Sequence, residues 1–306
     1  MNTTTRPVLV TWHPDIFLHD ATVRHCAMQP TRIADIHAVM SNVEGIRLEL
    51  SSPATREQFE RIHDAEYLDQ LQATSTLADG ELFEFDRETR LSRHTWRALA
   101  LSAGGVCQAV DAILNGAAPH AFNVAYAGHH AQASHASGFC FTNPVAIAAM
   151  HARACGVARI AVLDIDTHSG NGTILSLLHT PEILFAETYQ QGYPGSFLPG
   201  VRPVHILREK CNKAREFTYA WTRLLEKVAA HQPELILVSA GFDAHAADDL
   251  GLPGLSDDHY RWVADAIAAL GVPVVATLEG GYSVPDTARC AALFTSRLVA
   301  AARATS

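Results

Sequence analysis

The sequence lacks the cysteine pairs that suggest disulfide bonds or a thiolate metal site. Its 306 residues contain six cysteines, which are scattered and form no Cys-x-x-Cys pair. Regularly spaced cysteines are typical of disulfide-rich secreted domains and of structural zinc sites. We therefore expect neither of these, and we expect the reducing environment of the cytoplasm.

Long apolar runs and an excess of basic residues are also missing. The N-terminal segment from Met1 to Pro7 has no apolar signal core, and no apolar run approaches the roughly 20 residues needed to cross a bilayer. The 23 basic and 32 acidic residues give a formal net charge of −9. Because this charge repels phosphates, we expect no direct nucleic-acid partner and no membrane, whereas a cationic substrate would be weakly attracted.

Short β-rich runs alternate with alanine-rich helical stretches along the whole chain. This order is typical of a mainly parallel sheet covered by helices on both faces. The expected strands are 7–12, 123–127, 159–166, 183–189, 235–240 and 273–278, and the expected helices are 92–115, 144–155, 213–231, 256–270 and 286–302. No repeat, linker or low-complexity tract interrupts the pattern, so we expect a single α/β domain over residues 1–306.

Polar side chains follow the ends of the expected strands, where such folds place their ligand sites. Asp166 and His168 stand two positions apart after one strand, so their side chains can share a face. Asp243 follows a fully apolar strand that ends at the same edge. Zinc accepts carboxylate and imidazole ligands, and a catalytic site uses three of them. We interpret these residues as zinc ligands, and the alternative is that they cap a loop and the helix that begins near Asn171.

A second metal ion is not indicated. A binuclear site would want further carboxylates two residues after His168 and two before Asp243, where the chain has Gly170 and Gly241. One zinc ion per chain is therefore expected. The run Gly170-Asn171-Gly172 lacks the lysine and the spacing of a phosphate-binding loop, so nucleotide binding is not expected.

His129, His130 and Tyr282 lie beside glycines at two other strand ends. An imidazole beside a zinc-activated water can take up a proton and later return it to the leaving amine, so the two histidines fit a base and an acid. A tyrosine hydroxyl can donate to the oxyanion of an amide under attack. Alternatively, the histidines are buried hydrogen-bonding residues and the tyrosine belongs to the core.

Taken together in this order, the motifs resemble the histone deacetylase superfamily of zinc-dependent deacylases. That superfamily includes bacterial acetylpolyamine amidohydrolases and shares its architecture with arginases. The similar segments span nearly the whole chain and are His19 with Pro30-Thr31-Arg32, His63-x-x-x-Tyr67, Gly128-His129-His130-Ala131, Gly138 to Asn143, Asp164 to Thr173, Tyr193-Pro194-Gly195, Ser239 to His245 and Glu279 to Tyr282.

The resemblance implies a set of roles for these residues. Asp166, His168 and Asp243 would bind zinc, and Tyr282 would polarise the acyl carbonyl. His129, oriented by Asp164, and His130, oriented by Asn171, would form the acid/base pair. Phe139 and Tyr193 would wall an acyl-lysine tunnel, with Gly138 and Leu250 near its rim. The family also binds a structural potassium ion through Asp164 and a serine. The resemblance therefore implies a structural potassium ion in this chain as well. Here Glu187 replaces that serine, so it could supply an oxygen ligand with an added charge or the site could be altered, and Ser169 replaces a histidine that usually follows the zinc ligand.

These observations lead to a main hypothesis and two alternatives. The main hypothesis is zinc-dependent hydrolysis of N-acyl amides, most simply of acetyl-lysine in a peptide or protein. The first alternative is an amidohydrolase for acetylated polyamines or other small N-acyl amines, although the compact region between Tyr67 and Arg93 shows no insertion of the kind that narrows the entrance in polyamine enzymes. The second is a non-catalytic acyl-lysine binding protein, suggested by Ser169 and Glu187.

Overall fold

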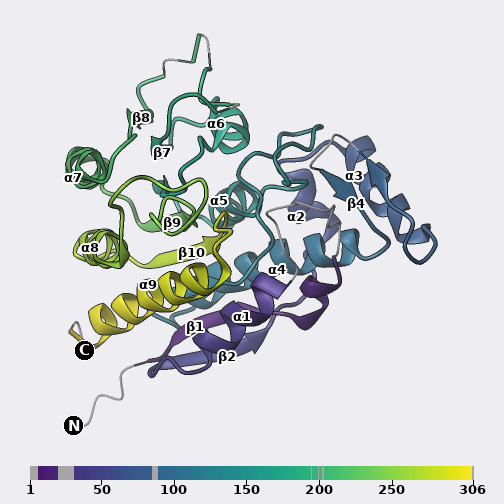
Figure 1. The fold of residues 1–306 in the computed structure, drawn as a ribbon, viewed down its shortest axis with the longest axis horizontal. Coiled ribbons are helices and arrows are strands. Elements are labelled where there is room, and N and C mark those ends of the chain that lie inside the picture. The colour runs from purple at the N-terminus through teal and green to yellow at the C-terminus, as the bar shows by residue number, and fades with distance from the viewer. Residues whose placement is uncertain are drawn as a thin grey trace.

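Eight parallel strands form the centre of the molecule (Figure 1). The computed structural model describes residues 6–19, 31–84, 89–193, 195–198, 200–201 and 203–304. Within these residues the strand order is β2-β1-β5-β10-β9-β6-β7-β8. The strands are β1 (Val8–Trp12), β2 (Ile46–Leu50), β5 (Ala121–Asn123), β6 (Ile160–Asp164), β7 (Ile183–Tyr189), β8 (Ile206–Lys210), β9 (Leu235–Ala240) and β10 (Val274–Leu278).

Helices cover both faces of this sheet, and each face has its own apolar core. The first face is covered by α1 (Thr31–Met40), α7 (Ala214–His231), α8 (Asp257–Ala268) and α9 (Val284–Ala304). The second is covered by the later turns of α4 (Thr95–Leu114) and by α5 (Pro144–Ala154) and α6 (Asn171–Leu177). In Figure 1, α7, α8 and α9 lie on one side of the sheet and α5 and α6 on the other.

Smaller elements complete the described part of the fold. They are the helices α2 (Arg56–Glu60) and α3 (Ala65–Ala73), the 3-10 turns η1 (Pro14–Leu18) and η2 (Thr74–Thr76), and an antiparallel pair of β3 (Phe83–Glu84) with β4 (Arg90–Leu91). None of the strands in the large sheet takes part in that pair.

The predicted parallel sheet with helices on both faces is confirmed. The central strands pair in parallel, and they are buried throughout because helices cover both of their faces. On β6, Val162 belongs to one core and Leu163 to the other, as expected for a strand covered on both sides. The edge strands β2 and β8 and the helix α1 were not predicted. Both strands carry charged residues and are only partly buried, so they lack the apolar signal of the central strands.

The strand predicted over 123–127 is shifted. The paired strand β5 begins at Ala121 and ends at Asn123, between β1 and β10. Val124 still donates its backbone N–H to the carbonyl of Thr11, but the chain then leaves the sheet. The residues after it lead to His129 and His130, so the end of the strand carries the histidines to the edge of the sheet.

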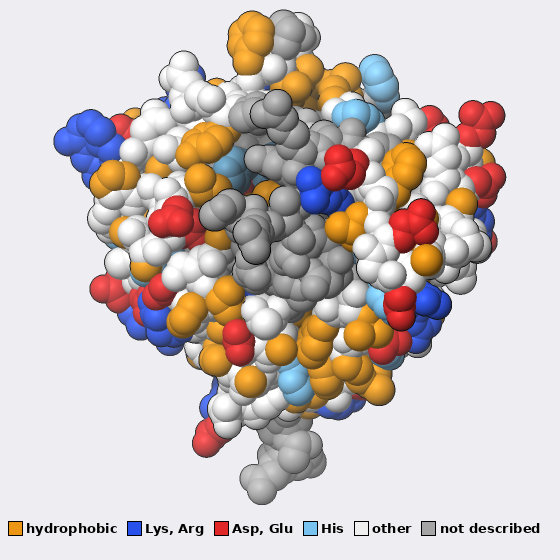
Figure 2. Space-filling view, turned by 45° about the vertical axis from the view of Figure 1, so that its right-hand side comes forward, with side chains coloured by type: hydrophobic (Ala, Val, Ile, Leu, Met, Phe, Trp, Pro, Cys, Tyr) orange, Lys and Arg blue, Asp and Glu red, His pale blue; other side chains and the backbone are white. Residues whose placement is uncertain are grey.

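Among the described residues, one helix is long and apolar enough to cross a membrane by length and composition, although no apolar run of that length was expected. It is α4, and 78% of its most apolar window is buried inside the fold, as in a core helix of a globular domain. On the face drawn in Figure 2, acidic and basic side chains of the described residues are interspersed, without a large patch of either sign.

One register of the sheet is polar on every strand. The strand pairing aligns Glu49, Thr11, Asn123, Thr277, Ser239, Asp164, Glu187 and Arg208, in the spatial order of the strands. Aligned residues of neighbouring parallel strands point to the same face. This polar row therefore closes the second core at the carboxyl ends of the strands, directly before the loops that carry the candidate site.

Candidate active site

Asp166, His168 and Asp243 converge at the ends of β6 and β9. One oxygen or nitrogen atom from each lies within 4.8 Å of the others, and all three side chains are buried. His168 Nδ1 is 3.1 Å from Asp166 Oδ1 and 2.9 Å from Asp243 Oδ2. The structure thus brings together the three residues that the sequence predicts as ligands of one metal ion.

Backbone groups hold the two carboxylates in place. Gly280 N–H donates to Asp166 Oδ2 at 2.9 Å, and Thr167 N–H donates to Asp243 Oδ1 at 2.9 Å. A Cβ atom on Gly241 would lie 2.1 Å from Asp166 Oδ2, and one on Gly280 would lie 2.5 Å from the same oxygen. Glycine is required at both positions because the ligand carboxylate occupies the space of a side chain.

The donor set fits a divalent cation. Asp243 Oδ2 is buried and has no hydrogen-bond partner among the described residues, although His168 Nδ1 is close. These two atoms lie 2.9 Å apart and form an ion pair when His168 is protonated, and both can turn to a metal ion when it is not. Two buried carboxylates also share one imidazole: burial lowers the pKa of His168, but Asp243 and Asp166 outweigh this effect and raise it to about 10. Bound zinc would neutralise the two carboxylates in place of the proton on His168, and carboxylate oxygens with an imidazole nitrogen suit it.

His129 and His130 are held by different partners. His129 Nδ1 lies 2.9 Å from Asp164 Oδ2, and His130 Nδ1 lies 2.6 Å from Asn171 Oδ1, which are the contacts that the resemblance implies. Burial opposes a charge on His129, but Asp164 and Asp166 outweigh it and raise its pKa well above the usual value. Burial and the neighbouring His129 lower the pKa of His130 to about 3. The two adjacent imidazoles therefore differ in their preferred protonation.

Tyr282 is fixed by a carboxylate that the sequence reading did not single out. Asp248 Oδ2 accepts the backbone N–H groups of Tyr282 and Ser283 at 2.6 and 2.9 Å. Burial raises the pKa of the Tyr282 phenol well above its usual value, and the carboxylates of Asp243 and Asp166 raise it further. The phenol is thus a protonated donor close to the predicted metal ligands.

The four residues predicted to form an acyl tunnel lie around this centre. The ring of Tyr193 packs edge-on against His168 at 4.8 Å, and the ring of Phe139 lies 6.1 Å from that of Tyr282, measured between centroids. A Cβ on Gly138 would meet the ring of His130 at 2.6 Å. Leu250 donates its backbone N–H to Asp248 Oδ1, the carboxylate that also fixes Tyr282.

Phe139 has a backbone conformation that L-residues rarely adopt. Its φ angle is +66°, and the preceding Gly138 has a φ angle of +54°. Such left-handed conformations cost energy in residues with a side chain and persist where the surroundings enforce them. Here the short bridge between Ser137 and Cys140 encloses the pair and turns the Phe139 ring toward Tyr282.

A second carboxylate without a predicted role anchors the histidine loop. Glu279 is fully buried, and its side chain accepts the N–H groups of Gly128 and His129 at 2.6 and 3.1 Å and the hydroxyl of Ser239 at 3.1 Å. Burial raises the pKa of Glu279 to about 7, against the effect of His129. The sequence signal was its place in the Glu-Gly-Gly-Tyr run, but its partners became visible only in the fold.

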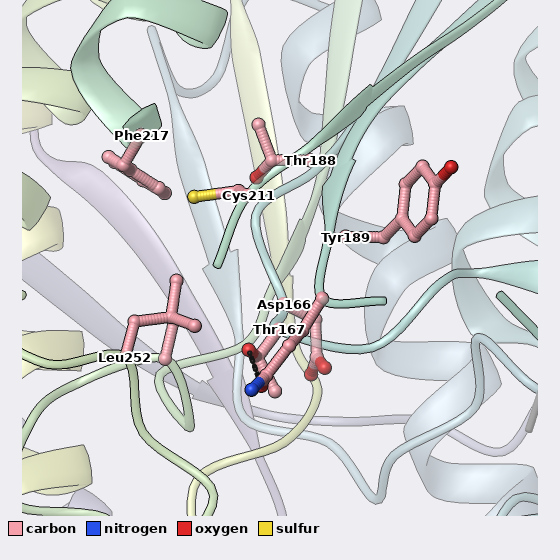
Figure 3. A pocket seen from close by; sticks show the side chains of 9 residues that line it. Asp166, Thr167, Thr188, Tyr189, Cys211, Phe217 and Leu252 are labelled. Carbon is pink, nitrogen blue, oxygen red and sulfur yellow. Dashed lines mark hydrogen bonds between the residues drawn. The ribbon is translucent and has the colours of Figure 1, made fainter. Parts of the chain in front are cut away.

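A small pocket lies behind the ligand loop (Figure 3). It is lined by Asp166, Thr167, Thr188, Tyr189, Gln190, Cys211, Phe217, Ala244 and Leu252. The two histidines and Tyr282 are absent from this lining of described residues. The pocket is therefore distinct from the surroundings of Phe139 and Tyr193, where an acyl chain is expected.

The residues beneath the ligands do not fit the potassium ion that the resemblance implies. Glu187 Oε1 accepts from Ser169 Oγ at 3.0 Å and from Arg208 Nε at 2.5 Å, and its Oε2 accepts from the Gly170 N–H at 2.9 Å. Asp164 Oδ1 accepts from a backbone N–H at 3.1 Å, and its Oδ2 faces His129. Donors thus occupy all four oxygens, and one donor is itself a cation.

Comparisons with known proteins agree on one family. Residues 26–298 match the model of the histone deacetylase domain. The chain is 33% identical over 262 residues to the histone deacetylase-like amidohydrolase of Pseudomonas aeruginosa, which covers 78% of this chain and 67% of that protein. It is 28% identical over 313 residues to acetylpolyamine amidohydrolase 1 of the same species, covering 87% and 90%.

Two further matches extend over almost the whole chain. An uncharacterized protein of Synechocystis is 30% identical over 295 residues, covering 92% of this chain and 96% of that protein. The solved structure of the HDA15 HD domain superposes with a TM-score of 0.90 at 24% identity and covers 97% of this chain and 90% of its own, which establishes the same fold. The chain therefore belongs to the histone deacetylase family of hydrolases.

Proposed function

We propose that this chain removes acyl groups from N-acyl amines with one zinc ion, and that acetyl-lysine in a peptide or protein is its substrate. The observation that carries the proposal is the convergence of one buried ligand atom from each of Asp166, His168 and Asp243 within 4.8 Å of one another. The acid/base pair and the tyrosine lie beside this point, and no residue expected in the chemistry is replaced.

When bound, zinc would polarise the acyl carbonyl and lower the pKa of a water molecule, so that the water can attack near neutral pH. Asn171 Oδ1 accepts the Nδ1 proton of His130, which leaves the lone pair of that ring on Nε2, where it can take the proton of the attacking water. Asp164 holds His129 by Nδ1 in the same way and stabilises its charged form. A charged His129 beside the reacting atoms suits proton delivery to the leaving amine.

Tyr282 stabilises the oxygen of the carbonyl that is attacked. Its phenol stays protonated because burial raises its pKa, and Asp248 fixes its backbone through two hydrogen bonds. A fixed hydroxyl aimed at the developing negative charge is a common source of transition-state stabilisation. The rings of Phe139 and Tyr193 would then enclose the apolar stem of the acylated side chain.

Release of acetate from an acetyl-lysine peptide tests this proposal. We expect the purified chain to release acetate, to lose this activity when zinc is removed by a chelator, and to regain it when zinc is added. Full activity after complete removal of metal would contradict the zinc mechanism. Binding of the peptide to the zinc-loaded chain without any turnover would instead support the non-catalytic acyl-lysine binding protein.

A second substrate class is supported by the relatives. Acetylpolyamine amidohydrolase 1 of Pseudomonas aeruginosa covers 87% of this chain, and the polyamine deacetylase HDAC10 of mouse covers 80%. The net charge of −9 would also attract a cationic polyamine. Values of kcat/KM measured side by side for an acetyl-lysine peptide and acetylputrescine decide between the two classes, and a higher value for acetylputrescine would reverse our assignment.

A further inference from the structure

A buried ion pair lies directly beneath the predicted zinc ligands. Glu187 on β7 is fully buried, and Arg208, its aligned partner on β8, has a side chain that is 14% exposed. The guanidinium donates through Nε to Glu187 and through Nη2 to the Ser169 hydroxyl at 2.8 Å and the Ser196 carbonyl at 3.2 Å. These contacts connect the edge strand to the residue that follows the zinc ligand His168.

Arg208 is also fixed from a fourth direction. Its guanidinium carbon lies 4.4 Å from the centre of the Tyr189 ring, an arrangement that favours a cation. In Figure 3 the Tyr189 ring lies apart from Cys211 and Phe217, on the other side of its strand. The ring thus points toward the face that carries Glu187 and Arg208, and it covers the ion pair.

The location of Arg208 matters because negative charge accumulates there. Asp164 and Glu187 are aligned on neighbouring strands, and both are fully buried. Burial raises the pKa of Glu187 to about 7, although Arg208 opposes this effect. An arginine keeps its charge at every physiological pH and forms several directed hydrogen bonds, so it can neutralise such a carboxylate permanently.

We propose that Arg208 is a built-in cation that takes the place of a bound monovalent ion beneath the zinc site and positions the Ser169-Gly170 segment between His168 and Asn171. The guanidinium bonds Ser169 directly and Gly170 through Glu187. The chain therefore needs no potassium for folding or turnover. Only the turnover part rests on the proposed function, since the stability part is independent of any activity.

The test compares potassium chloride with N-methylglucamine chloride at equal ionic strength, using the full chain loaded with zinc. We expect the thermal midpoint and the rate of acetate release of the wild type to be the same in both salts. Arg208→Met should lower the midpoint by roughly 5–10 °C and the turnover by about 10–100-fold in N-methylglucamine, and added potassium should restore part of both. Arg208→Lys, which keeps a cation, should remain indifferent to potassium.

Arg223→Met is the matched control, because Arg223 forms a partly exposed pair with Glu209 and its replacement should leave both quantities unchanged in either salt. Should Arg208→Met fail to fold, the double variant Glu187→Ser with Arg208→Met removes both charges and should respond to potassium.

A wild type that loses stability or turnover without potassium would overturn the proposal. So would an Arg208→Met variant that matches the wild type in both salts. If no form of the chain releases acetate, the midpoints alone decide the question, and only the proposed function fails.

Discussion

Asp164 and Glu187 are neighbours in the same register of the sheet, yet the fold uses them differently. Both carboxylates are fully buried at the ends of adjacent parallel strands. Asp164 faces His129, whose imidazole can gain and lose a proton, whereas Glu187 faces Arg208, whose charge is permanent. Burial is thus the same for both, and the partner alone separates the carboxylate that we propose to support proton transfer from the one that we propose to support the framework.

The largest expected effect is a loss of stability when the charge of Glu187 is removed. Glu187→Gln leaves the guanidinium of Arg208 buried without a counter-charge, so we expect the free energy of unfolding to fall by about 3–5 kcal/mol. Urea denaturation followed by circular dichroism measures this loss. Glu209→Gln is the matched control in a partly exposed pair and should change the free energy of unfolding by less than about 0.5 kcal/mol. Equal effects of the two variants would show that the buried pair has no special role.

Among the residues to which we assign chemistry, Tyr282 should have the largest effect. Tyr282→Phe should lower kcat on the order of 10²–10³-fold, because it removes one donor to the developing oxyanion. The ring and the backbone bonds to Asp248 are kept, so zinc content and thermal midpoint should not change. Steady-state kinetics with metal analysis measures both. Tyr189→Phe keeps the ring above Arg208 and should retain turnover. An unimpaired Tyr282→Phe enzyme would remove this residue from the mechanism.

His63 extends the comparison to a buried histidine whose hydrogen-bond partners in the described residues are backbone groups. It bonds the Gln132 carbonyl through Nδ1 and accepts the Asn143 N–H at Nε2, and burial lowers its pKa to about 4. The unfolded chain therefore binds the proton more readily between about pH 6.5 and 4, and stability is lost as the pH falls through that window. We expect His63 to account for roughly 3 kcal/mol of this loss. Denaturation curves at several pH values test it, since His63→Gln should flatten the dependence; an unchanged slope would contradict the assignment.

The smallest effect is expected from Asp164→Asn. The amide keeps the shape of the side chain but loses the charge that stabilises protonated His129, so turnover should fall about 10–100-fold while stability changes less than in Glu187→Gln. Acetate release and urea denaturation of the same preparation provide both numbers. If Asp164→Asn mainly reduced stability and Glu187→Gln mainly reduced turnover, the division between the two carboxylates would be reversed.

The sequence was sufficient to predict the central strands of the sheet, most of the helices on its faces and the residues that gather at its edge. Asp166, His168 and Asp243 each follow an apolar strand, and parallel strands end at a common edge, so proximity followed from the pattern. The edge strands were missed because their charged residues hide the apolar alternation. The start of β5 was misplaced because the apolar residues 124–127 continue beyond the paired strand.

Arg208, Glu279 and Asp248 could not be assigned in this way. Arg208 lies in the run Ile-Leu-Arg-Glu-Lys, where nothing local distinguishes it from its charged neighbours. Its role depends on the register between β7 and β8, which brings it beside Glu187. Asp248 acts on Tyr282 across 34 positions, through backbone N–H groups that every residue offers. Such contacts become visible only when the chain is folded.

The most direct test of the whole account is a zinc titration of the metal-free chain, in which bound zinc and acetate release are followed together. We predict that one zinc ion binds per chain, that acetate release rises in proportion to it, and that Asp243→Asn abolishes both while the chain remains folded. Acetate release by Asp243→Asn at the rate of the wild type, or by the chain before any zinc is bound, would contradict the metal centre from which the account is built.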